Sequence, residues 1–314
     1  MAERPSHDIP GGADASKHSA PKSAYELLVP QHEASAIRLE DFSDLYDIRQ
    51  DLEAVARKKK NIERIDPEPS HLAKTLEALF AEQIELSEWL GENAQTIITS
   101  TYDDFFNGVD MAVEFSTDQG FRHMVFGIDV TSSSQGLEKK LSIAREKIHE
   151  GKLTQIKYFK SDTSNIRGEL SNIPLFVIGV SAKTVSEVAS LRLLIHTLRQ
   201  KINQPEEMVG GVRFSPEAKE SFRERLRETS TKLASHFVRY QILQELSMQL
   251  EVFTAYAQEF GKDGIVETFN GIKSILEPLL KDMKASLDPA DQHLIEQDTV
   301  FQNLKGTLQQ VFSK

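Results

Sequence analysis

Cysteine is absent from this chain of 314 residues. Its absence excludes disulfides, thiolate nucleophiles, cysteine-ligated zinc and iron–sulfur clusters, and leaves carboxylate, imidazole and hydroxyl groups to carry any chemistry. No apolar run approaches the roughly 18 to 20 residues that a membrane-spanning helix needs. The N-terminal sequence MAERPSHDIPGGADASKHSAPKS contains no hydrophobic stretch typical of a signal peptide. These absences predict a cytoplasmic protein that does not contact a membrane.

Motifs of several common enzyme classes are missing as well. The chain has no G-x-x-x-x-G-K-[ST] sequence, which argues against a P-loop NTPase, and no G-x-S-x-G, which argues against an α/β-hydrolase. Its nine histidines form no H-x-x-x-H or H-E-x-x-H pair, so a zinc hydrolase is not expected. Carboxylates are therefore the first candidates for catalysis.

The net charge of −11 argues against indiscriminate binding of nucleic acid, but the charge is unevenly spread. Between residues 121 and 167 there are nine Lys and Arg side chains against five Asp and Glu side chains. This local positive excess would attract a polyanion. A solvated helix face is the alternative explanation of the same run.

Composition and hydrophobic spacing divide the chain into four parts. They predict a disordered tail at 1–34, a helical linker at 35–66, an α/β domain at 67–204 and a helical domain at 205–314. In the last part, near-heptad spacing predicts one helix of roughly 45 residues from Pro216, followed by helices at 265–286 and 290–312. These helices would form a three-helix bundle, a dimerising hairpin that makes the chain a homodimer, or a packing appendage.

The α/β domain is predicted from a change of hydrophobic period along the chain. A leucine stripe predicts a helix at about 71–92, and alternating apolar and polar residues predict strands between 96 and 131, with a hairpin turn in the STDQG sequence. A charged helix then ends at Gly151, and two further strands follow in LTQIKYF and NIPLFVIGVS. A helix at 183–203 would cover the second of them, which gives a mixed α/β sandwich.

Two aspartates lie within these apolar strands, Asp110 in GVDMAVEF and Asp129 in HMVFGIDVT. Removing water from an unpaired carboxylate costs several kcal/mol, so a buried strand rarely carries one without a partner. Asp129 and Thr131 project from one face of their strand, and Gly127 beside them leaves room for an approaching group. Two such carboxylates on neighbouring strands indicate a shared divalent metal.

This arrangement, with a helix, Asp110 and Asp129 on successive strands and then a lysine-rich helix, resembles the PD-(D/E)xK nuclease superfamily over residues 70–182. The resemblance implies a restriction-endonuclease-like mixed sheet flanked by helices. In that superfamily an acidic residue on the second core strand and a (D/E)-x-K on the next strand bind Mg²⁺. A glutamate on the first helix often completes the site.

Carried over by position, the resemblance makes Asp110 and Asp129 the metal-binding carboxylates, with the Val130 carbonyl as a further ligand and Glu82 as the helical glutamate. The metal would be Mg²⁺ or Mn²⁺, and the reaction would be hydrolysis of phosphodiester bonds in DNA or RNA.

One departure concerns the lysine, because Thr131 occupies its place. A threonine hydroxyl cannot act as a cation that stabilises developing negative charge. Some family members take the lysine from the following helix, so Lys140 is the favoured replacement and Lys157 the next, with Lys139 also within reach. All three remain open at this point.

Three functions are consistent with these residues. The first is a metal-dependent nuclease. The second is a catalytically inactive nuclease-like domain that binds nucleic acid or protein, which the missing lysine and the acidic composition favour. The third is a structural α/β domain in which lysines pair with the two aspartates. Asp103 and Asp104, which precede a turn-like stretch, are expected to orient the entry into the strand or to support a metal site indirectly.

Overall fold

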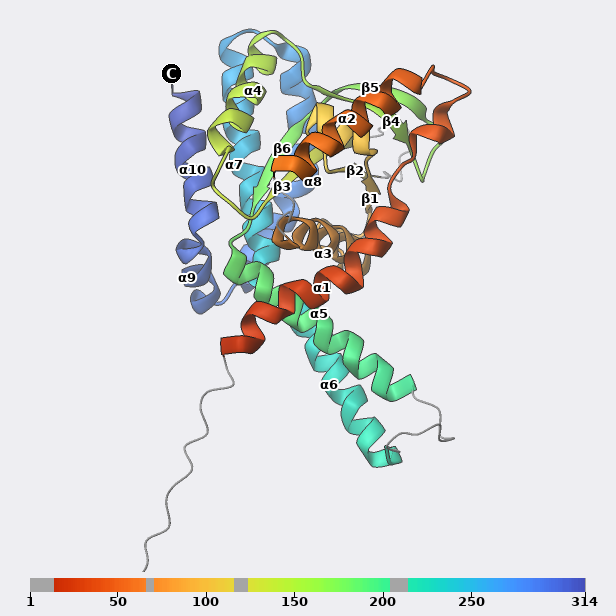
Figure 1. Ribbon diagram of the computed structural model, residues 1–314. Helices are drawn as coiled ribbons and strands as arrows, with labels where there is room; N and C mark the ends of the chain where they lie inside the picture. Colours follow the sequence, from red (N-terminus) through yellow and green to blue (C-terminus); the bar gives the residue numbers. More distant parts are fainter. Residues whose placement is uncertain (1–13, 66–70, 116–123, 204–213, 314) are drawn as a thin grey trace, which may run out of the picture.

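The structure is a computed structural model that describes residues 14–65, 71–115, 124–203 and 214–313 (Figure 1). The predicted STDQG turn lies outside these residues. The α-helices are α1 Asp14–Ser35, α2 Arg49–Ile65, α3 His71–Ser87, α4 Leu137–His149, α5 Ala182–Asn203, α6 Pro216–Ala234, α7 Phe237–Glu259, α8 Asp263–Ser286, α9 Pro289–Gln297 and α10 Thr299–Phe312. The short helices are η1 Leu39–Phe42 and η2 Asp103–Asn107, the latter a π-helical turn.

A four-stranded mixed sheet forms the centre, in the order β1-β2-β3-β6. Its strands are β1 Ala94–Ile98, β2 Met111–Phe115, β3 Met124–Thr131 and β6 Leu175–Gly179. The first three pair antiparallel, and β6 runs parallel to β3 after the chain crosses over through α4. The predicted mixed α/β architecture is therefore confirmed.

A second sheet consists of β4 Thr154–Lys160 and β5 Arg167–Ile173, which pair only with each other. The predicted strand LTQIKYF thus forms, but it does not join the central sheet. The small sheet packs against Val109, just before β2, and Ala112 of β2 through Ile156 and Phe159 of β4 and Ile173 of β5. The small sheet therefore covers one face of the large one.

The opposite face of the central sheet carries the largest buried core. Met111 and Val113 of β2 and Phe126 of β3 pack there with Leu79 and Phe80 of α3. This alternation follows the period of two that the sequence shows in both strands.

Helix α7 lies along the outer side of β6 and binds its backbone through side chains. The Gln249 side chain accepts a hydrogen bond from Val177 N–H at 2.9 Å and donates one to Val177 C=O at 2.8 Å. Glu245 accepts from Gly179 N–H at 2.9 Å, and Gln241 donates to Gly179 C=O at 3.0 Å. Because these three residues are spaced four apart, they share one stripe of the helix.

The C-terminal helices are not a separate layer, because the main core continues from the sheet into them. Leu246 and Phe253 of α7 and Leu304 of α10 belong to the same buried cluster as the central strands. The predicted 45-residue helix is wrong. It breaks at Ser235–His236, where the His236 ring nitrogen accepts from Val238 N–H and begins α7.

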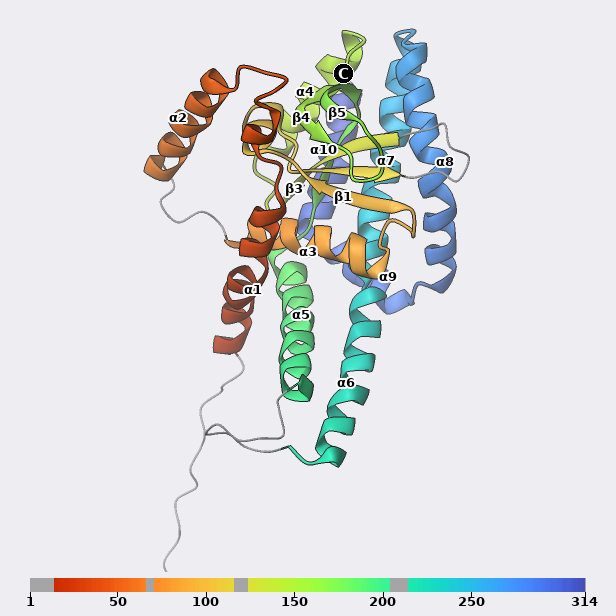
Figure 2. The ribbon, with the colours of Figure 1, turned by 90° about the vertical axis from the view of Figure 1, so that its right-hand side faces the viewer.

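The predicted disordered tail is wrong for residues 14–34, which lie in α1. Ala24, Leu28 and Val29 of this helix are buried against α3 and α5, so burial of a short apolar stripe outweighs a polar composition. Figures 1 and 2 show α5 and α6 side by side, projecting from the body as a two-helix arm. Within the described ranges, no helix has the length and apolar character needed to cross a membrane.

Candidate active site

Asp110 lies immediately before β2, at the point where the chain leaves the η2 turn. Gly108 makes this change of direction with a φ of 69°, in the left-handed region that glycine adopts without strain. The Asp110 N–H donates to Ile128 C=O at 2.9 Å, and its carboxylate Oδ2 accepts from Val130 N–H at 2.7 Å. The carboxylate is thereby fixed against β3.

Asp129 lies on β3 and forms an ion pair with Lys140 from the first turn of α4. The Lys140 Nζ is 2.6 Å from the Asp129 Oδ1, and the Asp129 side chain is 13% exposed. Thr131 does not take part, because its hydroxyl donates to Ser133 C=O at 2.9 Å and accepts from Ser133 N–H at 3.2 Å. The threonine thus shapes the turn into α4, and the lysine reaches Asp129 from that helix.

Two further carboxylates, Glu77 of α3 and Asp104 of η2, extend the cluster. Lys74 joins them, since its Nζ lies 2.8 Å from Glu77 and 3.6 Å from Asp104. Glu77 is only 5% exposed. Sequence reasoning missed Glu77 because it sought one apolar stripe on α3, whereas every residue from Thr75 to Ala81 is buried.

Burial and the charges of neighbouring carboxylates raise the pKa of Glu77, Asp110 and Asp129. The pKa of Asp110 lies well above its usual value because of burial first, and then because of the charges on Glu77, Asp129 and Asp104. Burial also raises the pKa of Asp129, although Lys140 opposes the shift. Lys74 and Lys140 pair with Glu77, Asp104 and Asp129, whereas Asp110 has no lysine partner among the described residues.

The four carboxylates line a cavity of about 730 Å³. Its wall also includes Lys58 of α2 and, from α4, Lys139, Lys140 and Lys147. Its deeper side is apolar and includes Val177, Phe253 and Phe269. A recess with a few convergent polar groups in an otherwise apolar wall is typical of a ligand site.

Asp103 holds the turn that carries Asp104. It is fully buried, and its carboxylate accepts from Ser100 Oγ at 2.7 Å, Asn107 Nδ2 at 2.7 Å, and the backbone N–H groups of Lys157 and Tyr158 at 2.7 and 3.1 Å. The two backbone contacts fix η2 onto β4, and the contacts with Ser100 and Asn107 brace the turn itself. Asp103 is therefore a structural residue that positions its neighbour.

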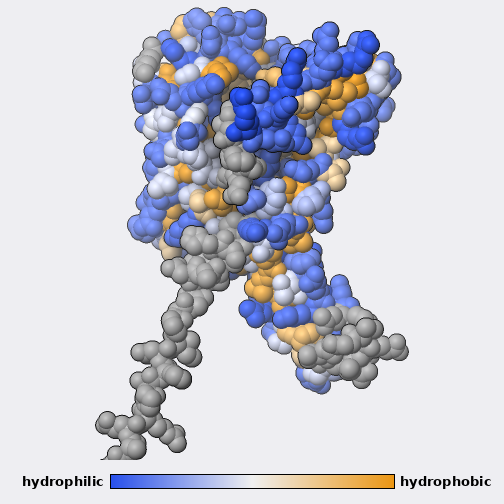
Figure 3. Space-filling model, viewed as in Figure 1, coloured by the Kyte–Doolittle hydropathy of each residue, from blue (hydrophilic) through white to orange (hydrophobic). Residues whose placement is uncertain are grey.

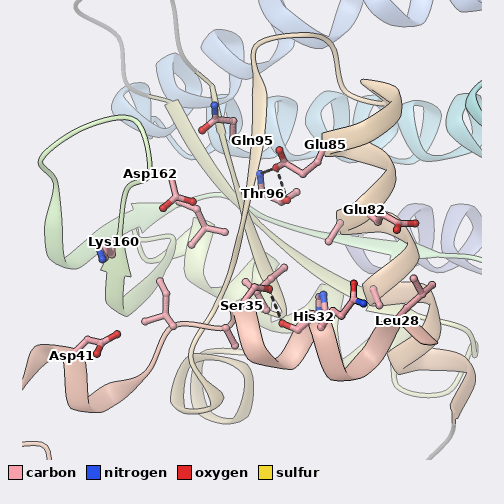
Figure 4. Close-up of a pocket in the computed structure, with 17 residues that line it drawn as sticks. Leu28, His32, Ser35, Asp41, Glu82, Glu85, Gln95, Thr96, Lys160 and Asp162 are labelled. Atoms are coloured by element: carbon pink, nitrogen blue, oxygen red, sulfur yellow. Dashed lines mark hydrogen bonds between the residues drawn. The ribbon is translucent and has the colours of Figure 1, made fainter. Parts of the chain in front are cut away.

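Two residues that the sequence assigned to the site lie elsewhere. Glu82 makes a two-pronged ion pair with Arg192 of α5, with N–O distances of 2.6 and 2.7 Å. Figure 4 shows it on the wall of a second cavity, of about 460 Å³, between α1, α3 and β1. Lys157 forms an ion pair with Asp51 of α2. Glu77, on the same helix as Glu82, and Lys140, the lysine that the sequence favours, line the carboxylate cavity.

Gly127 does not leave space for a ligand. A Cβ atom there would lie 2.9 Å from Val109 Cγ1 and 3.1 Å from Leu175 Cδ1. The group that approaches this glycine is thus the Val109 side chain, which packs the sheet against the β4–β5 hairpin.

The donor atoms suit a hard cation, although the side chains are not gathered around one point. In the part of the chain that the structure describes, no three His, Asp or Glu side chains converge to hold a metal ion. Asp110 Oδ1 and Asp129 Oδ2 make no hydrogen bond to the described residues. The Val130 carbonyl points to the same side as its N–H, toward Asp110. An all-oxygen set with one or two carboxylates is what Mg²⁺ uses when it keeps several waters.

Comparisons with protein-family models, with curated proteins and with solved structures found no match for this chain.

Proposed function

We propose that the chain is a metal-dependent nuclease that hydrolyses phosphodiester bonds, with its active site in the carboxylate cavity. The observation that carries the proposal is the position of Lys140. The resemblance to PD-(D/E)xK nucleases lacked a lysine at Thr131, and the Lys140 Nζ lies 2.6 Å from the Asp129 Oδ1. A cation beside a buried carboxylate pair is the combination that such a reaction needs.

The connectivity supports the proposal independently. The strands occur in the order β1-β2-β3-β6, with β6 parallel to β3 and α4 between them. Asp110 precedes the second strand and Asp129 lies on the third. The helix, the two aspartates near successive strands and the lysine-bearing helix agree with the order on which the resemblance rests, but the strand that joins the sheet after α4 is β6 and not the expected LTQIKYF. In this proposal α3 supplies Glu77 as the helical glutamate.

In this proposal, Asp110, Asp129 and the Val130 carbonyl would hold the ion. A bound Mg²⁺ supplies charge neutralisation at the phosphoryl oxygen and a water of lowered pKa. Lys140 stays beside Asp129 and offers its ammonium to the negative charge that develops on the phosphate. Glu77 lies near enough for its charge to raise the pKa of Asp110, and its carboxylate can accept a hydrogen bond from a water.

The second candidate function is an inactive domain that binds nucleic acid without cutting it. The observation that favours it is the same ion pair, because Lys140 already neutralises Asp129. A carboxylate satisfied inside the protein needs no metal.

Cleavage assays separate the two functions. We expect the wild-type chain to cut plasmid DNA or single-stranded RNA with Mg²⁺ or Mn²⁺, and Asp110→Asn or Asp129→Asn to lower the rate about 1,000-fold, equivalent to about 4 kcal/mol of transition-state stabilisation. The measurement is the initial rate of product formation on gels.

Glu77→Gln and Glu82→Gln are a matched pair on one helix. Only the first should reduce cleavage. Nuclease activity that survives both aspartate substitutions, or that is lost in Glu82→Gln and kept in Glu77→Gln, contradicts this site.

A further inference from the structure

The mouth of the carboxylate cavity carries an aromatic side chain beside free cations. Phe106 of η2 lines the cavity and is 45% exposed, whereas Tyr158, in the same aromatic cluster, is fully buried. The Phe106 ring lies 4.9 Å from that of Tyr102. Because Asp103 fixes η2 onto β4, Phe106 stands on a rigid support.

Of the four lysines that line this cavity, only Lys140 has a carboxylate partner among the described residues. Lys140 is paired with Asp129, and Lys147 donates to Thr154 Oγ1 at 2.9 Å. Lys58 instead donates to the Phe105 carbonyl and lies with its Nζ 4.9 Å from the centre of the Phe106 ring. Lys139 is exposed on α4. These two cations therefore remain available to an anion.

Helix α2 carries further exposed cations beyond Lys58. After Lys58 it continues with Lys59, Lys60 and Arg64, all exposed. Figure 3 shows strongly hydrophilic residues gathered over α2, and Figure 2 shows the helix standing away from the sheet. Because the net charge of the chain is −11, this local concentration of cations would attract an anion to this one face of the molecule.

The size of the recess limits what reaches the carboxylates. A volume of about 730 Å³ is in the range that encloses a drug-sized ligand. The enclosed acids line its wall, with Glu77 only 5% exposed. A base-paired duplex presents its phosphates on a rigid rod too wide for such a recess, whereas an unpaired strand can bend into it.

We propose that the cavity accepts single-stranded nucleic acid, with Phe106 stacking on a base and Lys58 and Lys139 binding the phosphates on either side. This inference rests on the proposed function for the location of the reaction, but the binding itself needs no metal. Aromatic rings interleaved with cations bind single strands regardless of sequence, because every base offers a face for stacking.

Fluorescence anisotropy in EDTA tests the inference, since no cleavage then occurs. The probes are fluorescein-labelled dT12, U12 and a 12-base-pair DNA duplex, and the full chain is used. We expect at least one single strand to bind more tightly than the duplex. Phe106→Ala should weaken that binding about 5- to 150-fold, whereas Phe106→Trp should retain it.

Lys58→Ala and Lys139→Ala should each weaken binding and reduce the slope of log affinity against log salt by about 0.7. Phe106→Ala should leave this slope unchanged. The matched controls are Phe260→Ala, another exposed aromatic, and Lys284→Ala, an exposed lysine near the C-terminal end of α8. Both should bind like the wild type.

Equal or tighter binding of the duplex, wild-type binding by Phe106→Ala, or no binding of any probe would overturn the inference. Its failure differs from that of the proposed function. If the chain binds single strands but does not cleave them in Mg²⁺, the proposed nuclease function is wrong and this inference stands. If the chain cleaves duplex DNA and shows no preference for single strands, the nuclease function stands and this inference is wrong.

Discussion

Buried carboxylates lie in two regions of this molecule, at Glu245 on α7 and at Asp110 and Asp129 in the cavity, and their surroundings differ. Glu245 of α7 uses both oxygens, one for Gly179 N–H at 2.9 Å and the other for Gln241 Nε2 at 3.4 Å. Asp110 and Asp129 use one oxygen each and line a cavity with lysines. Burial raises the pKa of Glu245 and of Asp110 alike. A raised pKa therefore does not distinguish a functional carboxylate from a structural one, whereas free oxygens in an open recess do.

The largest effect is expected from removing the structural carboxylate. Glu245→Ala leaves the Gly179 N–H without an acceptor in a fully buried place, and it opens a gap beside Gln241. We expect the free energy of unfolding to fall by about 3 kcal/mol, measured by urea denaturation. Gln244→Ala on the same helix is the control and should cost less than about 1 kcal/mol. An equally small loss of unfolding free energy in Glu245→Ala would contradict the structural role of this carboxylate.

The second effect concerns the lysine of the cavity. Lys140→Met removes the cation beside Asp129 and should lower the cleavage rate about 100-fold. Lys157→Met is the matched control, because Lys157 pairs with Asp51 outside the cavity. Initial rates with Mg²⁺ measure both. Equal losses in the two variants would show that Lys140 has no special role.

The smallest effect is a pH dependence. The folded-state pKa of Glu245 is raised by burial above its unfolded value, so its contribution to stability is full below about pH 4.3 and is lost as pH rises through the raised pKa. Glu245→Gln keeps an acceptor for Gly179 N–H and removes the group that titrates.

The unfolding free energy of the wild type relative to Glu245→Gln should therefore fall with rising pH, by at most about 1.4 kcal/mol per pH unit. Urea midpoints at several pH values provide the measurement. Parallel curves for the two proteins would mean that Glu245 does not titrate differently on folding.

Much of the central sheet was predictable because local alternation determines it. Met111 and Val113 share the face that the period of two assigns to them, and Lys140 lies in the helix from which a replacement lysine was expected. Glu77 was not predictable in the same way. It lies on a helix that is buried on more than one face, so no single stripe marks it.

Other features depend on contacts between distant segments. Glu82 follows Glu77 by five residues, which places it about 140° around the helix, and its partner Arg192 is 110 residues away. The break between α6 and α7 was not predictable from the sequence, because Ser235 and His236 make the turn and neither is a proline or a glycine. The sequence predicts space for a ligand at Gly127, but in the folded chain the Val109 side chain fills that space.

The side chains of α7 that bind β6 have a consequence for association. A strand at the margin of a sheet normally exposes N–H and C=O groups that a strand from another molecule can pair with. Here Gln249 and Glu245 already occupy the N–H groups of Val177 and Gly179. Two copies of this chain therefore cannot form a continuous sheet through β6. While α7 stays in place, a strand from a misfolded molecule cannot pair with β6 either.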